Sequence, residues 1–150
     1  STFIIPAVPV HLAFEWLRTY ENRKGAIEQL PVPKGFALRL PHTWEGSEGY
    51  MLTSYADFRC PEDCPEPANR CTVTGKKRGT PLYRLLAEVE TRGFGVHVIR
   101  SRQLAPGVGG YRVNDLKELL GKVLEGSKRK WLVATACKCH GVITALQIVP

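Results

Sequence analysis

The sequence lacks any apolar run approaching the roughly 20 residues that a helix needs to cross a bilayer. Its first 17 residues are apolar, but they have no basic leader and they contain two prolines, so we expect no signal peptide. From these two absences we expect no helical membrane anchor in this sequence and no association with membranes. The chain also begins without Met, so either that residue was removed before Ser1 or the chain is a piece of a longer protein.

Familiar catalytic motifs are missing as well. The sequence has no Ser/His/Asp arrangement, no evident pair of catalytic carboxylates and no H-E-x-x-H motif. We see no internal repeat and no low-complexity linker either. Hydrolase chemistry of the common types is therefore not indicated, and the sequence leaves open whether the protein is an enzyme.

The size and composition indicate an ordinary globular protein. The chain has 150 residues, of which 43% are hydrophobic and 23% are charged, so we expect a single domain over residues 1–150 with a core of its own. The net charge is +7, and the basic residues cluster at 70–78, 100–102 and 128–130. Such a surface permits binding to nucleic acid or another polyanion, although solvated loop ends account for the clusters more simply.

Hydrophobic periodicity and the turn residues predict an α/β fold. Strands are expected at residues 3–5, 36–40, 49–58, 94–101, 130–139 and 142–149, and helices at 11–25, 79–93 and 113–127. We take Thr80 and Asn114 as the N-caps of the last two helices and Gly25 as the C-cap of the first. The alternation indicates a mixed or mostly parallel sheet flanked by helices in a layered sandwich. A Cys/Pro-rich loop at about residues 58–79 interrupts this pattern.

All five cysteines fall into two short clusters about 65 residues apart in the chain, and this is the strongest chemical signal. The first cluster has the spacing C-x3-C-x6-C (Cys60, Cys64 and Cys71), and the second reads C-x-C-H (Cys137 and Cys139). An odd number of cysteines would leave one thiol outside any disulfide framework. A chain of this length needs no crosslinks, so we expect a reducing, cytoplasmic setting in which the clusters bind metal.

A strand at 130–139 would place Cys137 and Cys139 on one face, with Lys138 and His140 pointing away. The strand at 49–58 would deliver Cys60 to the same edge of the sheet. Three thiols from the Pro-stiffened loop and one from the second cluster then complete a four-thiolate site. Strand periodicity does not choose between Cys137 and Cys139. For His140 we favour no role in the site, and the alternative is that it binds the metal or donates a hydrogen bond to a ligand.

An iron–sulfur cluster is the cofactor that we expect, with zinc as the alternative. The spacings x6 and x1 lie outside the short pairs usual for structural zinc. The pairs Cys60-Pro61 and Cys64-Pro65 resemble a local feature of the ferredoxin run, where proline follows a ligand. With zinc, the protein would be an interaction module whose basic surface binds an acidic or nucleic-acid partner. Buried thiols without metal are a further reading, but the polar first cluster fits it poorly.

A third interpretation is a small-molecule enzyme with a site in the glycine turn at 107–110. Gly107, Gly109 and Gly110 precede a predicted helix, where backbone N–H groups can bind a phosphate. The segment matches neither the dinucleotide fingerprint nor the P-loop. Among the remaining histidines, we expect His97 to make a hydrogen bond in the core. His11 lies at a predicted strand-to-helix turn, where it is either a site residue or an N-terminal helix residue without a role.

Overall fold

The structure is a computed structural model that describes residues 2–20 and 26–150. Its centre is a six-stranded sheet in the order β3-β4-β9-β8-β5, with β2 paired to the second half of the long strand β9. The strands are β2 (Ala26–Leu30), β3 (His42–Glu45), β4 (Met51–Ser54), β5 (Gly95–Arg100), β8 (Lys130–Ala136) and β9 (His140–Val149). Only the β5–β8 pair is parallel among the pairings described, so the sheet is mixed.

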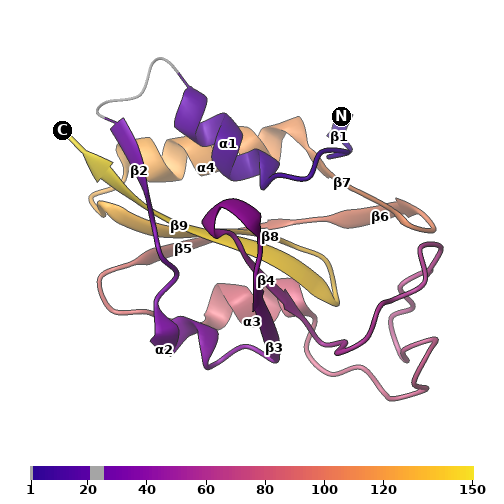
Figure 1. The fold of residues 1–150 in the computed structure, drawn as a ribbon. Helices are drawn as coiled ribbons and strands as arrows, with labels where there is room; N and C mark the ends of the chain where they lie inside the picture. The colour runs from indigo at the N-terminus through magenta and orange to yellow at the C-terminus, as the bar shows by residue number, and fades with distance from the viewer. Residues whose placement is uncertain (1, 21–25) are drawn as a thin grey trace.

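Helices cover both faces of this sheet (Figure 1). Helices α1 (Leu12–Thr19) and α4 (Val113–Glu125) lie on one face, and α2 (Lys34–Ala37) and α3 (Leu82–Glu88) lie on the other. Strand β8 supplies both cores, because successive side chains of a strand point to opposite faces. Trp131 and Val133 pack under α1 and α4, whereas Leu132 and Ala134 pack with α2 and α3.

A second, three-stranded sheet flanks the first. It contains β1 (Phe3–Ile4), β7 (Val108–Arg112) and β6 (Arg102–Ala105) in that order. Elsewhere in the chain, a short 3₁₀ turn, η1 (Ser47–Gly49), precedes β4 of the main sheet. The β6–β7 hairpin extends away from the helices toward the segment between β4 and α3 (Figure 1). This segment contains the cysteine loop, which we define as residues 58–79.

The fold class is mixed α/β, as the sequence predicts, but two parts of that prediction need correction. The sheet is not mostly parallel, because β9 pairs antiparallel with β2, β4 and β8. Strands also outweigh helices among the described residues, so a layered sandwich describes the molecule only loosely. None of the helices in the described ranges is both long and apolar enough to cross a membrane.

Local predictions failed where proline or a loop overrode the pattern. Residues 36–40, expected as a strand, form the end of the short helix α2 and the turn after it. The helix starts after Pro33, whose φ of −58° suits a helix start. Strand β2 was not predicted. Helix α3 begins after Pro81 rather than Thr80.

The first and last helices also differ at their ends. Helix α4 begins after Arg112, and the Arg112 N–H donates to the Asp115 carboxylate at 2.8 Å, so Asn114 is not its cap. Helix α1 ends at Thr19, and the expected cap at Gly25 lies outside the described residues.

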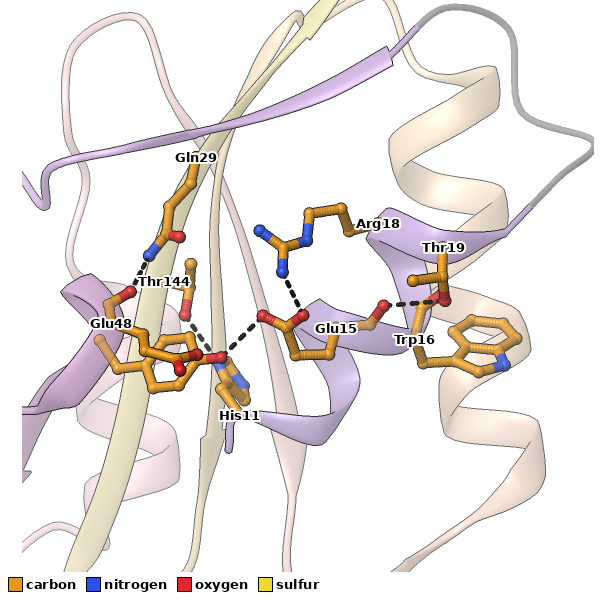
Figure 2. A network of polar contacts seen from close by, with 9 residues as sticks. His11, Glu15, Trp16, Arg18, Thr19, Gln29, Glu48 and Thr144 are labelled. Atoms are coloured by element: carbon orange, nitrogen blue, oxygen red, sulfur yellow. Dashed lines mark hydrogen bonds and ion pairs between the residues drawn. The ribbon is translucent and has the colours of Figure 1, made fainter. Parts of the chain in front are cut away.

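His11 anchors the start of α1 to the sheet. Its side chain is buried, with Nδ1 2.8 Å from Thr144 Oγ1 and Nε2 3.1 Å from Thr135 Oγ1. Burial lowers the pKa of His11 to about 3, so the ring is neutral at ordinary pH. Figure 2 shows His11 pointing toward Thr144, with Glu15 of α1 nearby. The Glu15 carboxylate accepts a hydrogen bond from the Tyr50 hydroxyl at 2.7 Å. His11 therefore joins the start of the first helix to the central strands β8 and β9.

Candidate metal centre

All five cysteine thiols line one cavity of about 500 Å³, together with the imidazole of His140. We call it the cysteine cavity. Its walls come from the cysteine loop, the turn between β8 and β9, and the β6–β7 hairpin. The thiols are all free. The two clusters, separated by most of the second half of the chain, therefore meet at one edge of the molecule.

The second cluster forms a turn rather than the end of a strand. Strand β8 ends at Ala136 and β9 begins at His140, and the Cys137 N–H donates to the His140 carbonyl at 2.9 Å. The N–H groups of Cys139 and His140 in turn lie 3.5 and 3.3 Å from the Cys137 sulfur. The alternation expected for residues 137–140 is thus wrong, because the chain reverses direction there.

Cys64 and Cys71 lie at the heads of similar turns. The Glu66 N–H is 3.4 Å from the Cys64 sulfur, and Glu66 has a left-handed backbone with φ of 50°. For Cys71, the hydroxyl of Thr74 and then the N–H groups of Thr74 and Val73 lower the pKa of the thiol to about 7. N–H and O–H donors stabilise a thiolate over a thiol. Backbone N–H groups therefore lie close to the sulfurs of Cys64 and Cys137, and among these turns the lowered pKa of Cys71 favours the thiolate, the form that binds metal.

His140 lies between Cys60 and Cys137. Its Nε2 is 3.4 Å from the Cys60 sulfur, and its Nδ1 is 3.9 Å from the Cys137 sulfur. Burial lowers the pKa of His140, so the ring tends to be neutral and able to donate a lone pair. Burial raises the pKa of Cys60, and the nearby Cys64 and Cys71 raise it further. The expectation that His140 points away from the thiols is wrong, since it follows a turn.

Cys139 has a different environment from the other four cysteines. It is buried, and its sulfur accepts a hydrogen bond from the guanidinium of Arg78. Its carbonyl accepts the Tyr55 N–H at 3.0 Å, which ties the turn to the end of β4. Sequence reasoning did not identify Arg78, because nothing in its local pattern separates it from the other basic residues of the loop.

Glu66 and Gln103 fasten the cysteine loop to the rest of the molecule. The Glu66 carboxylate accepts the Lys138 N–H at 2.6 Å and so joins the loop to the β8–β9 turn. The Gln103 side-chain amide donates to the Cys64 carbonyl at 2.6 Å from strand β6. The loop is therefore held on two sides by contacts that the sequence pattern did not reveal.

The same glutamate affects the neighbouring thiol. Burial, and next the charge of Glu66, raise the pKa of Cys137 to about 12.

The three glycines belong to the β6–β7 hairpin, not to a loop that caps a helix. Gly109 and Gly110 lie within β7, and Gly107 forms the turn with φ of 76°. A Cβ on Gly107 would lie 1.9 Å from the Glu62 carbonyl oxygen, so the hairpin tip touches the backbone of the cysteine loop. Gly107 and Gly109 line the cysteine cavity, whereas Gly110 packs against the Ile4 carbonyl. Cofactor binding by these glycines stays a prediction.

The thiols surround the cavity without converging on a single point. Across residues 2–20 and 26–150, no three His, Cys, Asp or Glu side chains are grouped as they would be around one metal ion. Binding at this site therefore requires the cysteine loop to move its thiols inward. Its prolines reduce the number of backbone conformations that are lost in such a step.

Comparison with known proteins identifies relatives along nearly the whole chain. A protein of Archaeoglobus fulgidus described as "Uncharacterized protein" is 36% identical over 148 residues, which cover 97% of this chain and 65% of that protein. The chain thus spans about two thirds of the length of this relative. No solved structure matches. A family model described as "Uncharacterized protein, C-terminal domain" matches residues 10–149, and the chain belongs to this family.

Proposed function

We propose that the domain binds an iron–sulfur cluster through the thiolates of Cys60, Cys64, Cys71 and Cys137. The observation that carries the proposal is that all the cysteines of the chain line one cavity, and that three of them accept hydrogen bonds from their own turns. Such a cluster supplies one-electron transfer, redox sensing or a structural crosslink. We propose a reducing, cytoplasmic setting, because free thiols persist there. The site lies at the rim of what we regard as a layered α/β domain.

Cys137 is a better ligand candidate than Cys139 because of what surrounds each sulfur. Two backbone N–H groups point at Cys137, and hydrogen bonds to sulfur are one way in which proteins tune iron–sulfur centres. Cys139 is buried, and its sulfur already accepts a hydrogen bond from the Arg78 guanidinium. In this arrangement Arg78 lies next to the site and offsets part of the negative charge that four thiolates bring.

The spread of the thiols favours a cluster over a single ion. The thiols surround a cavity of about 500 Å³, and among the described residues no three ligand side chains are grouped as they would be around one ion. A centre with several iron atoms keeps its thiolates farther apart than one ion does. A cluster would therefore need less inward movement of the cysteine loop than a single ion would.

Zinc is the second candidate, and the Cys60–His140 contact supports it. A tetrahedral zinc with the usual Zn–S and Zn–N bond lengths places these two ligand atoms about 3.6 Å apart. The observed separation between the Cys60 sulfur and His140 Nε2 is 3.4 Å. Zinc bound in this way would join the cysteine loop to β9 and would leave the protein as an interaction module.

The experiment is anaerobic expression of the chain, followed by visible absorption and by iron, zinc and sulfide content per chain. Iron with sulfide and broad absorption in the visible range supports the cluster, and stoichiometric zinc without colour supports the second candidate. Cys137→Ser should lose most of the bound metal, whereas Cys139→Ser, a matched change two residues away, should keep it. Folded protein without metal, and with freely titratable thiols, would overturn both candidates.

A further inference from the structure

A second hollow lies beside the cysteine cavity. It measures about 470 Å³ and is formed by the end of β5, the start of β6, the following turn and part of the cysteine loop. Three cationic side chains line it: Arg100, Arg102 and Lys138. We call it the basic hollow. It lies next to the cysteine cavity, because five residues line both spaces: Glu66, Ser101, Arg102, Gln103 and Lys138.

The positive charge of the basic hollow is not neutralised from within. Glu66 is the acidic side chain that lines it, and its carboxylate already accepts the backbone N–H of Lys138. The Lys138 ammonium group contacts the Glu66 carbonyl at 3.4 Å rather than a carboxylate. Within the part of the chain that the structure describes, the ion pairs involve other residues, and none is formed by Arg100, Arg102 or Lys138. Three cations thus face one concave space with a single acid among them.

The walls of the basic hollow are held in place by the fold. The Arg100 guanidinium lies over the Tyr83 ring, 4.5 Å from its centroid, and stacking of this kind restricts the orientation of its donors. The Ser101 N–H donates to the Ala136 carbonyl at 2.8 Å and fixes the step from β5 to β6. Gln103 is anchored to the Cys64 carbonyl. The cations are therefore presented from backbone that is already ordered.

We propose that the basic hollow binds a phosphate group. Guanidinium groups bind phosphate oxygens with two parallel hydrogen bonds, and three cations match the multiple negative charge of a phosphate better than that of a single carboxylate. The volume lies in the range of small-molecule sites. The phosphate belongs either to a free phosphorylated compound or to the backbone of a single nucleic-acid strand. This inference does not depend on which metal, if any, occupies the cysteine cavity.

The test is a calorimetric titration of the full chain at low salt with two probes, inorganic pyrophosphate and a short single-stranded oligonucleotide. The double variant Arg100→Gln/Arg102→Gln should weaken binding about tenfold or more, since it removes two guanidinium groups that would donate charge-assisted hydrogen bonds to the phosphate. Arg92→Gln is the matched control, because Arg92 is exposed and lies at the opposite end of β5. The control should bind as the unmodified chain does.

The outcomes separate the two sources of phosphate and allow refutation. Saturable binding of pyrophosphate that the double variant loses supports a free phosphorylated ligand. Loss confined to the oligonucleotide supports a nucleic-acid strand, and this binding should weaken as salt rises. If the double variant does not fold, Lys138→Gln tests the opposite wall. No binding of either probe, or equal loss in Arg92→Gln, would overturn the proposal.

Discussion

Replacing Gly107 by Ala should weaken the cysteine site although this residue carries no ligand atom. Gly107 has a φ of 76°, and a Cβ placed there would lie 1.9 Å from the Glu62 carbonyl oxygen, between Cys60 and Cys64. Ordinary carbon–oxygen contacts begin at about 3.4 Å, so the hairpin and the cysteine loop must separate by roughly 1.5 Å. Ligand positions in metal sites are defined to about 0.2 Å. The substitution therefore disturbs the loop far more than a metal site tolerates.

The magnitude has two separable parts. A left-handed backbone costs an alanine roughly 1–2 kcal/mol wherever it occurs. Gly93→Ala isolates this cost, because Gly93 has a φ of 84° and a Cβ placed on it would meet nothing within 4 Å. Any further loss in Gly107→Ala comes from its contact with the loop. We expect this loss to reduce metal affinity at least about tenfold, equivalent to about 1.4 kcal/mol.

The assay compares the two variants and the unmodified chain after dialysis against a graded series of chelator concentrations. Iron and zinc content per folded chain reports metal affinity, and thermal unfolding reports global stability. Both variants should unfold at lower temperature, but only Gly107→Ala should release metal at lower chelator concentration. Equal metal retention in the two variants would refute the reasoning that the hairpin tip positions the cysteine loop.

Three further changes test the fold and the site separately. His11→Gln should reduce the loss of unfolding free energy at acid pH. The pKa of His11 is about 3 in the folded protein, below its ordinary value of 6.5, because the ring is buried. The stability that the neutral ring contributes is therefore present above pH 6.5 and is lost toward pH 3, at up to about 1.4 kcal/mol per pH unit. Urea denaturation across that range measures the slope, and an unchanged slope would contradict this account. Glu66→Ala should reduce metal retention, because it removes the acceptor for the Lys138 N–H, whereas Glu66→Gln should restore most of it; equal retention in both variants would argue against a positioning role. Leu119→Ala should cost about 2–5 kcal/mol by urea denaturation, since the Leu119 side chain on α4 is fully buried, yet leave metal content per folded chain unchanged.

Local sequence signals were sufficient where one element decides the outcome alone. The apolar stripes predicted α4 within two residues and located α3, although α3 is about half as long as the helix expected at 79–93, and the β-branched run at 94–101 predicted β5. Cysteine spacing pointed to two clusters that share a site, and the structure places all five thiols on one cavity. Their role as metal ligands stays a prediction. These successes share a cause, since periodicity and residue chemistry are properties of short segments.

Tertiary structure decided everything that depends on contacts between distant segments. Because the chain turns at Cys137, His140 faces the thiols, although strand alternation placed it on the opposite side. Arg78 donates a hydrogen bond to Cys139, which lies 61 residues further along the chain. Gly107 packs closely against the backbone of Glu62, 45 residues before it. Turn direction, sheet pairing and close backbone approach are set by the packing of the whole domain. Hydrophobic periodicity carries no information about them, which is why the sequence identified two cysteine clusters and only the fold brought them to one cavity.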